Sequence, residues 1–102
     1  MNTVDAAKVE ETYNAWMEAV EAENKAKNEL KDIERELEQE ADKVRSLPLP
    51  VKEKLAMVAP ITERRLVAKE KYAQSRKMND YTRQVYDSTE CGFDINFTLE
   101  DF

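Results

Sequence analysis

The chain has 102 residues, of which 37% are charged and 41% hydrophobic, with a formal net charge of −6. This length limits it to one domain, and the negative charge disfavours nucleic acid as a direct ligand. There is one glycine, one cysteine and no histidine. A phosphate-binding loop, an activated thiol and the commonest general base are therefore not expected, and we predict no enzyme activity, cofactor or metal site.

Residues 3–46 are predicted to form one long amphipathic helix capped by Asn2 or Thr3. Apolar residues recur there at steps of three and four and form one stripe. Its members are Val9, Tyr13, Trp16, Met17, Val20, Leu30, Ile33, Leu37, Ala41, Val44 and Leu47. Such a helix is about 65 Å long, too long for one partner helix to enclose the stripe. We therefore predict a homo-oligomer whose interface contains Tyr13, Trp16, Val20, Leu30, Ile33, Leu37 and Val44.

The segment "SLPLP", residues 46–50, predicts a turn, because proline pushes the preceding residue out of the helical region. Pro50 suits the first turn of a second helical segment over residues 51–88. Pro60 interrupts that segment, so we expect a break at 58–60 with a short helix before it, or a kink. Its predicted buried residues are Leu55, Val58, Ile61, Leu66, Val67, Tyr72, Met78, Tyr81 and Val85.

Charge is distributed unevenly between the two segments, since the first is acidic and residues 47–88 are basic overall. This asymmetry favours antiparallel pairing. The predicted fold is an all-α, elongated, coiled-coil-like antiparallel hairpin over residues 1–90. The basic run at residues 63–83 is interpreted as a face paired with the acidic helix, and the alternative is an anion site at Arg64, Arg65, Arg76 and Lys77. The carboxylates of residues 29–42 leave mimicry of DNA as a minor alternative.

The last twelve residues, "CGFDINFTLEDF", form an extended acidic tail in this prediction. Gly92 is expected to stop the second helix, and the apolar residues that follow alternate with polar ones as in a strand. A partner would be bound by Phe93, Ile95, Phe97, Leu99, Glu100, Asp101 and Phe102. The final "LEDF" resembles the tip of bacterial single-stranded-DNA-binding proteins, and that resemblance implies an acidic, Phe-terminated peptide that inserts into basic, apolar pockets.

These features favour a non-catalytic protein-interaction protein, an oligomeric hairpin that binds a protein partner through its apolar stripe and its tail. Small, acidic, glycine-poor helical proteins of this type are common among phage or mobile-element inhibitors of host machinery, an analogy that suggests such an inhibitor. One alternative is a structural subunit of a virion or scaffold. Another is a sponge for an anionic nucleotide at subunit junctions, for example at Tyr13 with Lys25 or Lys27. No signal peptide or membrane-spanning stretch is apparent, so a cytoplasmic location is predicted.

Overall fold

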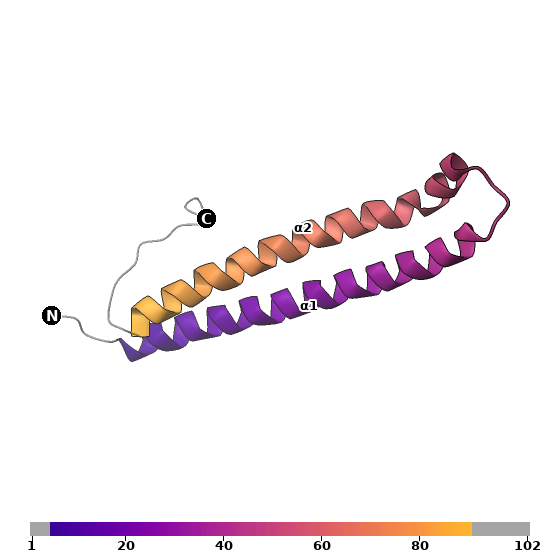
Figure 1. Cartoon of the computed structure of the whole chain (residues 1–102). Coiled ribbons are helices and arrows are strands. Elements are labelled where there is room, and N and C mark those ends of the chain that lie inside the picture. Colours follow the sequence, from indigo (N-terminus) through magenta and orange to yellow (C-terminus); the bar gives the residue numbers. More distant parts are fainter. Residues whose placement is uncertain (1–4, 91–102) are drawn as a thin grey trace. The chain divides into compact units, whose positions relative to one another are not determined.

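The computed structural model describes residues 5–90 of the chain and contains two long helices, α1 (Ala6–Arg45) and α2 (Val51–Glu90). Within these residues there is no strand, so the all-helical prediction is confirmed. Figure 1 shows the two helices joined by the turn at residues 46–50. The predicted tail, residues 91–102, and every partner-binding residue assigned to it lie outside the described residues.

Helix α1 begins at Ala6 because Asp5 caps it. The Asp5 Oδ1 atom accepts hydrogen bonds from the backbone N–H groups of Ala7 at 3.0 Å and Lys8 at 3.4 Å. The Asp5 carbonyl accepts the first helical bond, from Val9 N–H at 2.9 Å. A carboxylate at this position also interacts favourably with the positive end of the helix dipole. The predicted cap at Asn2 or Thr3 is therefore wrong.

The turn between the helices is closed by hydrogen bonds at both ends. The N–H of Leu47 donates to the carbonyl of Val44 at 3.0 Å, and the Lys54 ammonium donates to the carbonyl of Arg45 at 3.0 Å. A cation at this site satisfies a free carbonyl at the negative end of α1. Pro50 precedes the first helical residue, Val51, and its carbonyl accepts bonds from the N–H groups of Glu53 and Lys54, both at 3.1 Å.

Helix α2 is continuous through Pro60. The separate short helix expected over residues 51–58 is therefore not observed, and a bend of the helix axis at Pro60 stays a prediction. Proline removes one helical N–H donor at this point. Two residues later, the Thr62 hydroxyl donates to the carbonyl of Val58 at 3.1 Å, a type of bond that often accompanies bends in helices.

The described residues form two compact units, each built from both helices. The first contains residues 5–24 and 73–90, and the second contains residues 25–72 with the turn. In each unit a stretch of α1 lies beside a stretch of α2 that runs in the opposite direction (Figure 1). The predicted hairpin pairing is confirmed in each.

In the second unit the helices meet along a seam, a row of half-buried or buried positions spaced alternately by three and four residues. The seam contains Ala26, Leu30, Ile33, Leu37, Glu40 and Val44 of α1, and Lys54, Val58, Ile61, Arg65, Ala68 and Tyr72 of α2. This spacing is that of a coiled coil. Most of the aliphatic side chains of this seam come from α1, and α2 contributes two charged residues and a tyrosine.

The seam of the first unit has the same spacing and is richer in polar residues. It contains Val9, Thr12, Trp16, Ala19 and Glu23 of α1, and Ser75, Asn79, Thr82, Tyr86 and Thr89 of α2. The Thr82 and Thr89 hydroxyls donate to the carbonyls of Met78 and Val85, both at 2.8 Å. These bonds within α2 satisfy the hydroxyls, so threonine can face α1 at little cost.

Three residues predicted to be buried in α2 are exposed. Leu55, Leu66 and Val67 are 62%, 60% and 63% exposed. The reason is helical phase, because Leu55 and Leu66 each follow a seam position by one residue, a rotation of about 100°. The other six predicted residues of α2 are half-buried. Of the stripe predicted for the first helix, Tyr13 in α1 and Leu47 in the turn are exposed, and the remaining residues are half-buried or buried.

Neither unit encloses a large core. Among residues 5–90 only Ala19, Val44, Ala68 and Thr89 are buried, and no large side chain is fully buried. Two helices have only one line of contact, so each side chain in the seam keeps a solvent-exposed edge. Neither α1 nor α2 contains a stretch long and apolar enough to cross a membrane.

Candidate interaction surfaces

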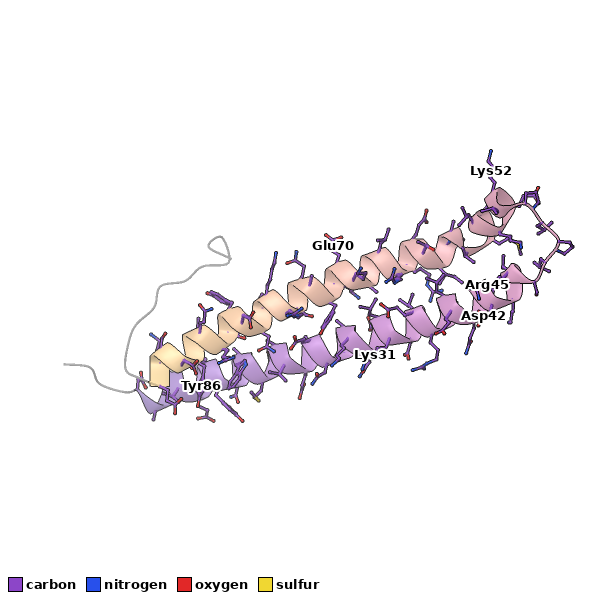
Figure 2. The ribbon with its side chains drawn as sticks, viewed as in Figure 1. Lys31, Asp42, Arg45, Lys52, Glu70 and Tyr86 are labelled. Atoms are coloured by element: carbon purple, nitrogen blue, oxygen red, sulfur yellow. The ribbon has the colours of Figure 1, made fainter. Side chains whose placement is uncertain are left out.

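An aromatic cluster joins the two helices of the first unit. Tyr86 of α2, labelled in Figure 2, stacks on Trp16 of α1 with ring centroids 5.4 Å apart and 24° between the planes. Tyr13 meets both rings edge-on, at 6.3 Å from Trp16 and 5.5 Å from Tyr86. Such pairs contribute about 0.5–1.5 kcal/mol beyond the area that they bury. The cluster therefore links α1 and α2 through aromatic contacts as well as aliphatic ones.

A chain of hydrogen bonds extends from this cluster. The Trp16 Nε1–H donates to Asn79 Oδ1 at 2.8 Å, and Asn79 Nδ2 donates to Glu23 Oε2 at 2.6 Å. The Glu23 Oε1 atom lies 4.0 Å from Arg76 Nε. Each partner constrains the next, since an indole only donates and a carboxylate only accepts, so the amide of Asn79 has one favourable orientation. A polar residue at a seam position can specify the register of paired helices, and Asn79 occupies such a position with both of its amide atoms hydrogen-bonded.

The pKa of Tyr86 is raised above its ordinary value of 10.0. Partial burial of the phenol is the main cause, followed by the negative charge of Glu90 and a hydrogen bond to it, with smaller effects from Tyr13 and Asp87. All of these disfavour the phenolate. The neutral hydroxyl is therefore the form that the fold selects.

A dependence on alkaline pH follows from this shift. Since Tyr86 ionises at a higher pH in the folded than in the unfolded chain, it stabilises the fold below pH 10.0, and this contribution is lost as the pH rises through the folded pKa. We expect wild type to lose stability more steeply than Tyr86→Phe above that pH. Chemical denaturation at stepped pH measures this, and phenolate absorbance of both proteins gives the pKa. Parallel stability curves would contradict it.

Ion pairs connect the basic face of α2 with the acidic face of α1 in the second unit. Arg64 Nη1 lies 3.0 Å from Glu36 Oε1, Arg65 Nε lies 3.6 Å from Glu34 Oε1, and Lys71 Nζ lies 3.8 Å from Glu29 Oε2. The interpretation of residues 63–83 as a face paired with the acidic helix is confirmed for these cations. The pairs are solvent-exposed, so each contributes about 0–1 kcal/mol. Their main effect is to specify which faces meet.

The alternative interpretation of the basic run was an anion site made of four residues. These four residues are divided between the two units. Arg64 and Arg65 belong to the second unit, and Arg76 and Lys77 to the first. Arg64, Arg65 and Arg76 each lie within 4.0 Å of a glutamate of α1. An anion would have to compete with these carboxylates, and the anion role stays a prediction.

An exposed apolar row follows α2 in the second unit, and we call it the outer stripe. It consists of Val51, Leu55, Ala59, Thr62 and Leu66, all of which are exposed. Val51 is 71% exposed, and Leu55 and Leu66 are 62% and 60% exposed. The hydroxyl of Thr62 donates to the carbonyl of Val58 at 3.1 Å, so this polar group is satisfied within α2. Exposed apolar side chains gathered along one helix face are a candidate interaction surface.

On another side of α2 a groove of about 560 Å³ lies between the helices of the second unit. Its apolar lining consists of Ile33, Pro60, Val67 and Ala68, and its charged edges are Glu29, Glu63, Arg64 and Lys71. Both basic residues of the groove form ion pairs with carboxylates of α1, since Arg64 pairs with Glu36 and Lys71 with Glu29. The groove is therefore a second exposed apolar surface, edged by equal numbers of acidic and basic residues.

Six of the seven residues predicted to form an oligomer interface lie at or beside the seam. Trp16, Val20, Leu30, Ile33 and Leu37 are half-buried, Val44 is buried, and Tyr13 is exposed. Most of the apolar area of these six is thus used within one chain, and their role in an oligomer stays a prediction. The outer stripe was not predicted as a surface, because the sequence alone does not show that the row 54, 58, 61 and 65 is the one that faces α1.

Residues 5–90 contain no group of three or more side chains suited to hold a metal ion. Tyr13 belongs to the first unit, and Lys25 and Lys27 belong to the second, so the nucleotide-sponge hypothesis stays a prediction about junctions between chains. No known protein family, curated protein or solved structure matches the chain. Its function must therefore be inferred from its own side chains and surfaces.

Proposed function

We propose that the chain is a non-catalytic protein-interaction module. In this proposal the hairpin associates with other polypeptide chains through the outer stripe of α2 and through its C-terminal tail, residues 91–102. The observation that carries the proposal is the distribution of side chains on α2. Leu55 and Leu66 are more than half exposed, whereas the seam of the same stretch contains Lys54 and Arg65.

Burial of the outer stripe by a partner supplies the driving force for association in this proposal. Full burial of a valine or leucine side chain contributes about 1.5–3 kcal/mol, so the exposed parts of Val51, Leu55 and Leu66 together represent about 3–5 kcal/mol. Association costs at least about 4 kcal/mol in lost freedom of motion. The stripe of one chain therefore needs apolar surface of comparable size on its partner, as one helix face provides to another.

The narrower hypotheses stay open within this proposal. An inhibitor from a phage or mobile element would use the outer stripe or the tail on a host component. A virion or scaffold subunit would use the same surfaces on further copies and grow without closing. Light scattering at increasing protein concentration distinguishes them, because a closed oligomer reaches a constant mass and an open assembly does not.

Deletion of residues 91–102 is expected to abolish capture of a partner from the native host while helicity, measured by circular dichroism, stays nearly unchanged. Helix α2 is described to Glu90, so the deletion leaves the described residues of both helices in place. A Leu55→Glu/Leu66→Glu variant tests the outer stripe in the same way, with Val67→Glu as the matched control. Undiminished capture by both the truncated chain and the double variant would contradict the proposed function.

A further inference from the structure

Four of the five outer-stripe residues have a spacing that is the same in both directions along α2. Leu55, Ala59, Thr62 and Leu66 follow one another at intervals of four, three and four residues. Residues three and four apart lie on one face of a helix. If a second α2 lies antiparallel against this face, with a two-fold axis between Pro60 and Ile61, Leu55 of each copy meets Leu66 of the other. The small residues Ala59 and Thr62 then face each other at the centre and allow a close approach.

Charged residues beside the stripe match the same arrangement. Lys52 and Glu70 are eighteen residues apart, which is five turns of about 3.6 residues, so they point in the same direction from α2. Figure 2 shows both side chains on the side of α2 away from α1. In an antiparallel pair of identical helices each flank of one helix faces the same flank of the other. The register that joins Leu55 to Leu66 therefore brings Lys52 close to Glu70 of the second copy, twice.

We infer that the outer stripe is the interface of an antiparallel, two-fold symmetric dimer in which α2 packs on α2 of a second copy. This inference rests on the proposed function and names the partner at the same surface. The second copy is favoured because residues 55–66 of one row supply both halves of the contact, with Leu55 and Leu66 in reversed order, and because Lys52 and Glu70 carry opposite charges at nearly equal distances from the axis. Two-fold interfaces of this self-complementary type are the commonest in soluble oligomers.

Analytical ultracentrifugation of the full chain tests the interface. The wild type is expected to sediment with about twice the chain mass of 11.9 kDa. Leu66→Glu is expected to weaken dimerisation at least about tenfold, because it puts a charge against Leu55 of the second copy. Val67→Glu is the matched control, since Val67 is equally exposed, at 63% against 60% for Leu66, and lines the groove instead. It is expected to change the dissociation constant by less than about threefold.

Charge reversal tests the register. Lys52→Glu and Glu70→Lys are each expected to weaken the dimer about two- to fivefold, and the double variant restores the wild-type constant. Both positions are exposed, so these variants keep the hairpin folded, as circular dichroism verifies. A monomeric wild type, a Val67→Glu variant as weak as Leu66→Glu, or a double reversal weaker than either single variant would each overturn the inference.

The same set of variants separates this inference from the proposed function. A monomeric wild type that still captures a host protein, and that loses the capture with Leu55→Glu/Leu66→Glu, would remove the second copy as partner and leave the interaction module in place. Equal losses of dimer with Val67→Glu and Leu66→Glu would instead assign the interface to the groove side of α2.

Discussion

Replacement of Trp16 by alanine is expected to lower the free energy of unfolding by about 2–3 kcal/mol, because a half-buried Trp loses less than the larger cost of a fully buried one. The ring is stacked on Tyr86 at 5.4 Å, and its N–H donates to Asn79 at 2.8 Å. The variant loses both the apolar contact and the partner of the Asn79 amide, which leaves that amide less satisfied. Chemical denaturation followed by circular dichroism, at one protein concentration, measures the loss.

A second variant divides this loss between the ring and the hydrogen bond, and a third is its control. Trp16→Phe keeps an aromatic ring without the N–H donor, so it is expected to retain part of the stacking energy and to cost about 1 kcal/mol. Tyr13→Ala provides the matched control in the same cluster, since Tyr13 is 43% exposed and is expected to cost less than Trp16→Ala. An effect of Tyr13→Ala that equals or exceeds that of Trp16→Ala would contradict the central position given to Trp16.

Val44→Asp is expected to have the largest effect in the second unit. Val44 is only 3% exposed, at the last turn of α1. The substitution loses about 1.5–3 kcal/mol of apolar burial, and it places a carboxylate at a buried position, where removing its hydration is costly. We expect a total loss of about 3 kcal/mol or more, a large fraction of the stability of a chain of this size.

The control for this substitution is Val67→Asp, the same chemical change at a residue that is 63% exposed. It is expected to change the free energy of unfolding by about 0.5 kcal/mol or less. Val44→Ala gives an intermediate point, because it removes apolar area without adding charge. If Val44→Asp destabilised the chain no more than Val67→Asp, the tight contact at this end of α1 would be disproved. Denaturation curves at equal protein concentration give all three values.

The elements of the fold were predictable because their signals are local. The alternation of steps of three and four residues predicted α1, and "SLPLP" predicted the turn. The observed bounds, Ala6–Arg45 and Val51–Glu90, differ from the prediction mainly at the start of α1, where Asp5 forms the cap. Capping depends on which of several neighbouring polar residues precedes the first turn. The prediction named Asn2 or Thr3 and did not consider Asp5, which forms the cap.

The orientation of α2 was much harder to predict. Its apolar residues are spread around the helix, so periodicity alone did not separate Val58 and Ile61, which lie in the seam, from Leu55 and Leu66, which do not. The choice also depends on polar contacts of the seam. Asn79 accepts a hydrogen bond from Trp16, sixty-three residues away in the chain. No local pattern in the sequence predicts a bond over that separation.

The amino-acid sequence by itself determined the two helices, the turn between them and the charge asymmetry that pairs an acidic helix with a basic one. These depend on neighbours within a few residues and on net charge. Only the tertiary structure decided which side of α2 packs on α1, that Trp16, Asn79 and Glu23 form one hydrogen-bonded chain, and that Leu55 and Leu66 stay exposed. The physical reason is that two helices can meet in several phases with similar apolar burial. Side-chain contacts between distant residues, satisfied together in one phase, select among them.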